Sequence, residues 1–292
     1  MLNTLNFKYY YIKIYICQGV KIVINMNLRE IIIDAIKYPI SDTRKFLIFC
    51  VLIILMSLST ILPSYGIKNN TLTLILTIVT LIISIIVLGY LVDVVKSGTE
   101  RGNTLPDFDY VKQFVNGFKA LILDIIYFFI PAILVIIVAS ASGLFSSFTK
   151  IAHTSINAIV NGANNLTAIT AAIPQSTINT FTNALTVTLI VGIILFIIFS
   201  LLSVAGMVRF AKTGSGVEGL RFRKIIKDIS NVGLLKVIVT LIVIYIIAFL
   251  LSIVVGLIGL IPYIGVLIGS FIGMPFILIF IFRATGLLYA DA

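Results

Sequence analysis

Three ionisable residues border long apolar runs in this 292-residue sequence and are its first candidates for chemistry: Asp93, Asp124 and Arg283. A charged side chain inside a membrane-spanning helix is costly, and it is a functional candidate by default. Each of the three, however, lies within about two helical turns of a polar segment, where long side chains reach the interface and pair easily. We therefore expect structural ion pairs, with Asp124 bound to Lys119 or to a basic residue of the loop 209–227.

Nucleophiles and metal ligands are scarce. His153 is the only histidine, and the two cysteines, Cys17 and Cys50, lie far apart in the chain. One histidine and two separated thiols provide neither a metal site nor a disulfide framework. The sequence also contains no HExxH, GxSxG, Walker A or CxxC motif. We predict that the protein is not an enzyme and has no cofactor, catalytic residue or metal ligand, and the sequence identifies no ligand-binding residue.

The composition places the chain in a membrane. Hydrophobic residues make up 60% of the sequence and charged residues only 11%, whereas soluble domains carry about 25% charged residues. Several apolar runs approach the roughly 20 residues that cross a bilayer. The formal net charge of +10 is divided among several loops. Because nucleic-acid binding requires basic residues gathered on one face, we expect no nucleic-acid partner.

We predict an all-α polytopic membrane protein with six transmembrane helices arranged as three hairpins. The spans lie at about 46–62, 72–92, 120–139, 185–208, 237–260 and 264–288. Short turns close the first hairpin around Pro63, Gly66 and Asn69 and the third at Pro262-Tyr263. The segment 140–184 is rich in Ser, Thr, Asn and Ala, and it forms an outer polar connection. It is either a pair of amphipathic helices on the outer leaflet or a cover over the bundle.

An amphipathic segment precedes each odd-numbered span, and helices of this type lie in the membrane interface. In the segment 28–37, Asp34 and Lys37 have the i,i+3 spacing of an ion pair. Proline disfavours helix in the residue before it, so Pro39 should end this helix, and Ser41 or Asp42 can cap the next one.

The other two amphipathic segments are 108–118 and 220–232. In 108–118 the aspartates before the helix, Asp107 and Asp109, suit its N-terminal cap. The apolar positions that make these segments amphipathic are Phe108, Val111, Phe114, Val115 and Phe118 in 108–118, and Leu220, Ile225, Ile226, Ile229 and Val232 in 220–232.

A similar stop ends each even-numbered span: Lys96-Ser97-Gly98, Lys212-Thr213-Gly214 and Arg283-Ala284-Thr285-Gly286. Glycine just after a helix commonly adopts the left-handed conformation that caps it, so we expect a C-cap at each stop. Interfacial helix, span, turn, span and stop thus recur over 28–98, 108–214 and 220–286. We interpret the units as an internal repeat, although any helical hairpin needs similar caps and charges.

Span six contains the motif Gly265, Gly269 and Gly273, one glycine every fourth residue. Small residues at this spacing let another helix approach closely. The partner helix is either in the same chain, near Gly256 and Gly259, or in a second copy. A kink is expected near Pro275, because proline interrupts the helical hydrogen bonds.

Lysine and arginine alternate between the two sides of the membrane. The five connections between spans contain one, four, one, seven and no basic residues in chain order. Since basic loops remain in the cytoplasm, we predict a multi-pass protein of the cell membrane with both termini cytoplasmic. The glycosylation sequons at Asn69 and Asn165 then lie outside.

The first 25 residues lack the apolar core and cleavage site of a signal peptide. They are either a basic, aromatic tail on the lipid surface or the product of an over-extended gene start. On the second interpretation, which we favour, residues 1–25 are a mis-assigned leader and the chain begins at Met26, so that 26–292 is a single membrane domain.

Two stretches carry a family resemblance: GYLVDVVKSG with the following LPDFDYVKQFVNGFKALILDIIYFFIPAIL, and the earlier NLREIIIDAIKYPISDTRKFLI. Here the chain resembles the domain of unknown function family 4013, multi-pass membrane proteins found largely in archaea. The resemblance extends over most of residues 26–289. It implies a membrane location and a start near Met26, and it implies no activity.

These observations favour an uncharacterised, non-catalytic membrane or envelope component that binds a partner. The alternative is a small-solute transporter or permease-like protein, since repeats and broken helices occur in such folds. The expected partners are the bilayer itself, anionic lipid headgroups at the basic cytoplasmic loops, and a protein partner or a second copy of the chain.

Overall fold

The computed structural model describes residues 26–64, 66, 69–261, 265 and 268–292. The leader 1–25, with Cys17, and the expected Pro262-Tyr263 turn lie outside the described residues. Every regular element in the described part of the chain is helical, which confirms the all-α class.

The helices follow one another with short connections. Their bounds are α2 Leu28–Lys37, η1 Tyr38–Ile40, α3 Thr43–Ser64, α4 Asn70–Thr99, α5 Tyr110–Ala141, α6 Leu144–Val160, α7 Leu166–Ala171, α8 Gln175–Thr213, η2 Glu218–Leu220, α9 Phe222–Val232, α10 Leu234–Gly259, η3 Gly269–Gly273 and α12 Met274–Leu288. Here η1 and η2 are short 3-10 turns and η3 is a π-helical turn.

Five stretches of the described chain are helices long and apolar enough to cross a membrane: α4, α5, α8, α10 and residues 271–288, which include α12. They coincide with predicted spans two to six. The predicted first span lies in α3, which has 22 residues and is not among the five. The structure therefore supports several membrane-spanning helices, and the six-span arrangement stays a prediction.

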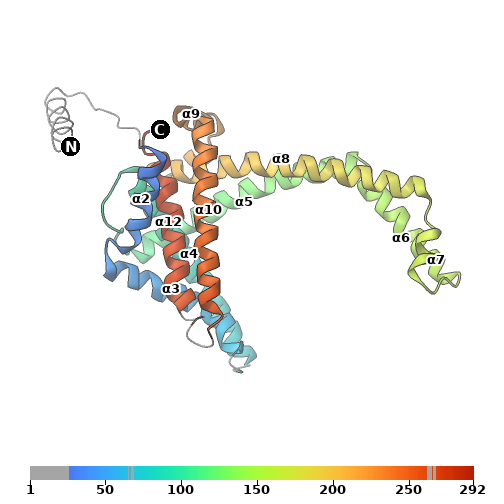
Figure 1. The fold of residues 1–292 in the computed structure, drawn as a ribbon, viewed down its shortest axis with the longest axis horizontal. Coiled ribbons are helices and arrows are strands. Elements are labelled where there is room, and N and C mark those ends of the chain that lie inside the picture. The colour runs from blue at the N-terminus through green and yellow to red at the C-terminus, as the bar shows by residue number, and fades with distance from the viewer. Residues whose placement is uncertain (1–25, 65, 67–68, 262–264, 266–267) are drawn as a thin grey trace.

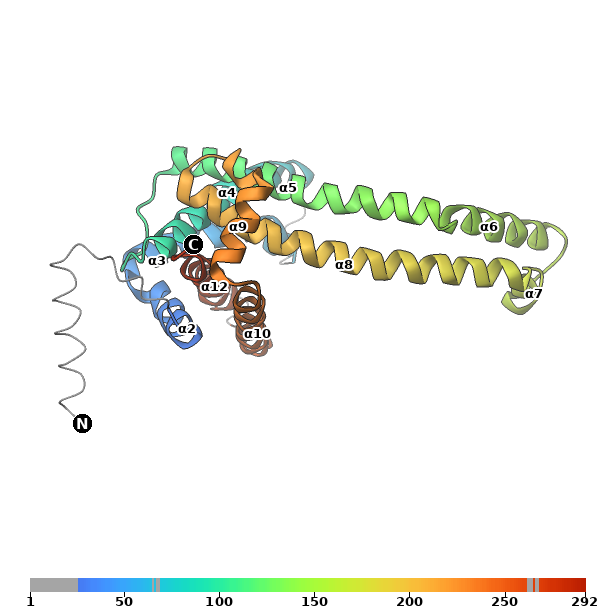
Figure 2. The ribbon, with the colours of Figure 1, turned by 90° about the horizontal axis from the view of Figure 1, so that it is seen from above.

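The helices do not form one compact bundle. Helices α2, α3, α4, α10 and α12 lie together, whereas α5 and α8 run side by side away from them and across the direction of α10 (Figures 1 and 2). We call residues 128–196, the outer parts of α5 and α8 with α6 and α7 between them, the arm. Helices α6 and α7 lie at its far end. The segment 140–184 is therefore no cover over the bundle, and that alternative is wrong.

Two apolar clusters form the core of the body. One joins α8, α9, α10 and α12 around Phe210, Ile225, Ile244 and Phe280. The other joins α3, α4 and α12 around Phe49, Tyr90 and Ile279, with Cys50 fully buried beside them. Tyr90 stacks between Phe49 and Phe108, at ring-centroid distances of 5.0 and 4.4 Å. The core thus lies where the ends of α4, α8 and α12 meet.

Segment 108–118 is not the separate interfacial helix that was predicted. Helix α5 continues without interruption from Tyr110 through the whole third span. Its buried positions are Gln113, Gly117 and Ala120, whereas Val111 and Phe118 are exposed. The predicted apolar face therefore points away from the protein.

Two glycines explain why α5 buries the face that carries Gln113 and Gly117. A Cβ atom on Gly89 of α4 would overlap the backbone of Gln113, and one on Gly117 of α5 would overlap the carbonyl of Ile85. The backbones of α4 and α5 can approach this closely only because both positions lack a side chain. Close backbone packing, and not apolar burial, decides the rotation of this helix.

The other two amphipathic segments do form separate helices. Helix α2 ends at Lys37 and is followed by η1, which contains Pro39, while Asp42 accepts the N–H of Lys45 at 3.1 Å at the start of α3. Helix α9 is separated from α10 by Gly233, whose φ of 95° only glycine adopts easily. The prediction of helices at 28–37 and 220–232, and of an end near Pro39, is confirmed.

The three stop glycines differ in role. Gly214 caps α8 with a φ of 70°, as predicted. Gly98 and Gly286, however, lie inside α4 and α12, where a Cβ on Gly98 would come within 2.9 Å of the Cα of Gly286. The C-cap prediction is wrong for these two, because they form the contact between α4 and α12.

The glycines of span six pack inside the chain. A Cβ on Gly273 would overlap the side chain of Val255 on α10, and one on Gly265 would overlap the carbonyl of Ile258. Their main partners are thus Val255 and Ile258 of α10, whereas Gly256 and Gly259 were the expected ones. The helix also contains the π-helical turn η3 directly before Pro275, where a kink was expected.

Candidate functional site

A buried arginine joins the two ends of the chain. Arg283 on α12 donates from Nε to Oδ1 of Asp34 on α2 at 2.8 Å, and its Nη1 lies 3.4 Å from the Ser97 hydroxyl of α4. Its guanidinium carbon lies 4.0 Å from the ring centroid of Tyr38. These four residues, the Arg283 cluster, connect α2, η1, α4 and α12.

The cluster is buried on one side only. Arg283 is 1% exposed, whereas the side chain of Asp34 is 37% exposed and reaches solvent. The Tyr38 hydroxyl donates to the Thr104 carbonyl and lies 2.7 Å from the Ser97 hydroxyl. Burial raises the pKa of Tyr38, so this hydroxyl stays protonated as a donor. The predicted Asp34–Lys37 pair is wrong, because Arg283 is the partner of Asp34.

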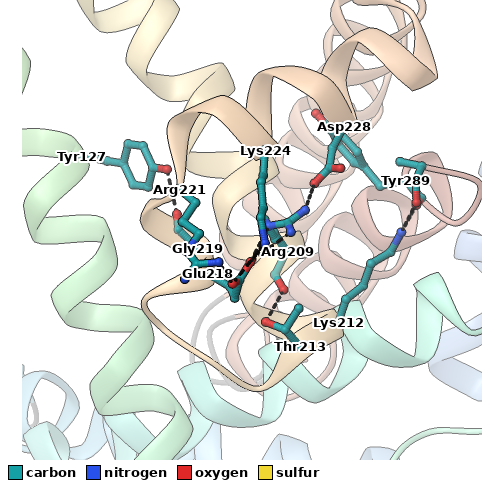
Figure 3. Close-up of polar contacts among 11 residues, drawn as sticks. Tyr127, Arg209, Lys212, Thr213, Glu218, Gly219, Arg221, Lys224, Asp228 and Tyr289 are labelled. Atoms are coloured by element: carbon teal, nitrogen blue, oxygen red, sulfur yellow. Dashed lines mark hydrogen bonds and ion pairs between the residues drawn. The ribbon is translucent and has the colours of Figure 1, made fainter.

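A second arginine holds α9 against α8. Arg209 donates from Nη1 to Asp228 at 2.7 Å and from Nη2 to Glu218 at 2.9 Å (Figure 3). Glu218 also pairs with Arg221 at 2.5 Å and with Lys224 at 3.2 Å. We call these five residues the Arg209 cluster.

Contacts next to the Arg209 cluster also join α5 to η2 and α8 to the end of α12. The side-chain hydrogen bond from Arg209 lowers the pKa of the Glu218 carboxyl, with smaller contributions from Lys224 and Arg221. Tyr127 of α5 donates to the carbonyl of Gly219 at 2.8 Å. Lys212 donates to the carbonyl of Tyr289 at 2.7 Å and so connects the ends of α8 and α12 (Figure 3).

The third polar contact lies between α4 and α5. Gln113 donates to Asp93 at 3.4 Å and to the carbonyl of Asp107 at 3.0 Å, and Lys112 lies 3.4 Å from Asp93. Asp109 caps α5 by accepting the N–H of Lys112 at 3.1 Å. Asp107 does not cap the helix but pairs with Lys45 at 2.9 Å.

The clusters support the predicted repeat. Units one and three place a buried isoleucine, an aspartate and a second buried residue at the same spacing: Ile31, Asp34 and Ala35; Ile225, Asp228 and Ile229. In both, the aspartate binds an arginine near the end of an even-numbered predicted span. Because Asp34 lies in the first unit and Arg283 near the end of the third, this pair joins the first and last units.

The remaining candidates are separate from these clusters. Asp124 accepts a hydrogen bond from Ser203 at 3.2 Å, and no ion pair with Lys119 or the loop 209–227 is found in the described part of the chain, so the predicted partner is wrong. His153 is exposed on α6. Within the described residues, no three His, Cys, Asp or Glu side chains are close enough to hold a metal ion.

An apolar groove opens where α8 and α10 diverge beneath α9. Its volume is about 650 Å³, and almost all of its lining is aliphatic: Ile197, Ile198, Leu201, Leu202, Ile226, Ile229, Ser230, Leu234 and Ile238. A smaller cavity of about 390 Å³ lies between the start of α2 and α10, lined by residues that include Lys236 and Thr240.

A family model described as "Protein of unknown function (DUF4013)" matches residues 72–261. The chain belongs to this family. The matched region includes the contact between α4 and α5, the arm and the Arg209 cluster. It excludes α2 and α12, which form most of the Arg283 cluster. No curated protein and no solved structure matches the chain.

Sequence reasoning identified Asp93, Asp124 and Arg283 as structural residues, but it assigned no partner to Arg283 or Asp93 and missed Arg209. The sequence did contain a signal for Arg209. A charged residue lies three positions before the stop lysine in both units one and two: Asp93 before Lys96, and Arg209 before Lys212. The groove beneath α9 had no such signal, because its residues come from three separate helices.

Proposed function

We propose that this protein is a non-catalytic membrane component that uses its arm to bind another protein within the membrane. The observation that carries the proposal is the arm itself: α5 and α8 leave the body as a paired extension (Figure 2). A hairpin that only completed a bundle would pack along its whole length against the other helices.

The apolar surface of the arm favours a partner. In the most apolar 18-residue window, 17% of residues are buried in α5 and 11% in α8, compared with 17% in α4, 28% in α10 and 56% in the last span. The arm therefore presents isoleucine and phenylalanine on several sides, including Phe129, Ile133, Ile190 and Ile194. Large exposed apolar surfaces mark membrane or protein contacts.

The base of the arm is fixed by polar contacts. Tyr127 on α5 binds η2, and Arg209 on α8 binds both η2 and α9. These bonds hold the two arm helices relative to the body. A partner bound to the arm would therefore be oriented relative to the face at which α4, α8 and α12 end, which carries the basic loops and which we call the basic face. A rigid base is what a partner-positioning component requires.

We further propose that this face is cytoplasmic and that the protein lies in the cell membrane with both termini inside. The contact of Lys212 with Tyr289 and the ion pair of Arg101 with Asp291 at 2.6 Å support a common side. They bring the ends of α4, α8 and α12 together. The excess of basic residues in the loops at these ends favours the cytoplasm.

A small-solute transporter is the second candidate. The observation that favours it is the π-helical turn η3 before Pro275, since transport sites often contain interrupted helices. Against it, the polar groups that are buried in the body gather near the helix ends, and the two core clusters are otherwise mainly aliphatic and aromatic. Flux of labelled solutes into proteoliposomes would raise this candidate above the first.

Site-specific photo-crosslinking tests the proposed partner contact. A photoreactive amino acid is placed at Ile133 or Ile190 on the arm, and at Ile253 on α10 as a matched control, since all three are exposed apolar positions. We expect protein adducts in native membranes from the two arm positions and lipid adducts alone from Ile253. Mass spectrometry of the adduct separates a second copy of the chain from a different protein. Lipid adducts alone from all three positions would contradict the proposal.

A further inference from the structure

We infer that the groove beneath α9 binds one anionic membrane lipid, with an apolar chain between α8 and α10 and the headgroup at Arg223 and Lys227. The volume of about 650 Å³ lies within the roughly 300–1,000 Å³ typical of small-molecule sites. Its lining is aliphatic except for Ser230, which suits a hydrocarbon chain and no polar solute.

The groove follows from the architecture. Helix α8 turns outward with α5 as the arm, while α10 stays with α12 in the body (Figure 1). Gly233 separates α9 from α10, so α9 lies over the space between the diverging helices. The lining reaches from α9 to Ile197, 12 residues before Arg209, which is roughly 18 Å along α8 at 1.5 Å per residue. The groove thus extends from α9 outward along α8.

The two faces of α9 carry different charges. Asp228 and Lys224 belong to the Arg209 cluster on the side toward η2. Residues three or four apart are neighbours on a helix surface, so Arg223 is a neighbour of the lining residue Ile226, and Lys227 is a neighbour of the lining residue Ser230. Both basic side chains are exposed, and in the described part of the chain no acidic residue forms an ion pair with either.

Charge complementarity therefore selects the occupant. Two cations at the opening of an aliphatic groove match a lipid that has a phosphate or other anionic headgroup and an apolar chain. A transmembrane helix of a partner would fill the groove without using these charges. A zwitterionic lipid would use them only weakly.

The chain contains no tryptophan, so one substitution supplies a unique fluorescent reporter. We would place it by Ile226→Trp at the groove and by Ile253→Trp on α10 as the control, because both isoleucines are exposed. The protein is reconstituted in phosphatidylcholine nanodiscs that contain a small fraction of brominated-chain phosphatidylglycerol or brominated-chain phosphatidylcholine. Bromine quenches tryptophan only on contact.

We expect Ile226→Trp to be quenched preferentially by the anionic lipid and Ile253→Trp to be quenched equally by both lipids. Each basic residue near an anionic headgroup contributes roughly a five-fold preference, so Arg223→Gln with Lys227→Gln should abolish a preference of roughly twenty-five-fold. The matched control, Lys37→Gln with Arg44→Gln, removes the same charge from the same predicted side and should leave the preference unchanged.

Three results would overturn the inference. Equal quenching of Ile226→Trp by both lipids would show that the groove does not select charge. A preference that survives the Arg223 and Lys227 substitutions would assign it to other residues. Absence of quenching by either lipid would mean that protein, and not lipid, fills the groove. The arm crosslinks are unaffected by any of these results, so the two proposals fail separately.

Discussion

Removing Asp34 should destabilise the protein more than removing Arg283, although the two form one ion pair. Asp34→Ala leaves the guanidinium, 1% exposed, without its carboxylate. Breaking a buried pair in this way costs about 3–5 kcal/mol. Because Asp34 is 37% exposed, solvent screens the pair, and we expect about 2 kcal/mol. Arg283→Met leaves a carboxylate that water can solvate and removes the contact with Tyr38, for about 1 kcal/mol.

The double variant separates the contact from the burial of charge. Asp34→Leu with Arg283→Met replaces both partners by apolar side chains, which is often nearly neutral for a buried pair. We expect it to be more stable than Asp34→Ala alone. The order of stability should be wild type and the double variant first, Arg283→Met next and Asp34→Ala last.

The buried thiol of Cys50 provides the assay. This residue is 0% exposed in the α3–α4 core, next to the Arg283 cluster through Tyr38. With Cys17→Ser, only Cys50 reacts with a thiol-specific dye, and it reacts when the body opens during heating or SDS titration. If Arg283→Met is as unstable as Asp34→Ala, or if the double variant is the least stable, the carboxylate does not serve to neutralise a buried charge.

Three further predictions test other contacts. Gly286→Ala should destabilise the protein by about 1–3 kcal/mol, because the new methyl group would overlap the Val95 carbonyl, whereas Gly256→Ala, with open space around it, should have little effect in the same thiol assay. The pKa of Glu218 is lowered in the fold, so its contribution to stability is present above the usual value of 4.5 and is lost as pH falls through the lower folded value. The protection of the α9 amides against hydrogen exchange, corrected for the intrinsic pH dependence of exchange, should therefore fall on acidification below that range, and Glu218→Gln should show the same reduced protection at neutral pH. Expression in a glycosylating host should modify both Asn69 and Asn165, and modification of one alone would contradict the predicted topology.

Helix positions were predictable from the sequence because a bilayer leaves few alternatives. A backbone in lipid must satisfy its own hydrogen bonds, so the length of an apolar run nearly fixes a helix. Spans two, five and most of six follow this rule. Breaks were also local: Pro39 ends α2, and Gly233 separates α9 from α10.

Which face of a helix is buried was not predictable by the same reasoning. In α5 the apolar stripe with Val111 and Phe118 is readily found in the sequence, but it is exposed, whereas Gln113 and Gly117 are buried. The rule that apolar residues lie inside holds where the alternative is water. Lipid is as apolar as leucine, so close packing of small residues decides the buried face instead.

The pairing of charges required knowledge of the contacts between helices. Asp34 and Lys37 have ideal spacing for an ion pair, but Arg283, 249 residues away from Asp34, takes the carboxylate. A buried guanidinium must be neutralised, whereas exposed Lys37 gains little from a surface pair. The need to neutralise buried Arg283 therefore determines the partner of Asp34, although the two residues are far apart in the sequence.

The direction of the arm is likewise set by contacts between helices. Helix α5 is tied to α4 by the close contacts at Gly89 and Gly117, and α8 is tied to η2 and α9 through Arg209. These contacts lie near one end of each helix, so they set the angle at which both helices leave the body. The 108–118 region packs directly on α4 and is continuous with the third span, which removes the freedom that a separate interfacial helix would have had. The arm and the groove beneath α9 are therefore two consequences of one arrangement, in which α5 and α8 are held at the basic face and diverge from α10.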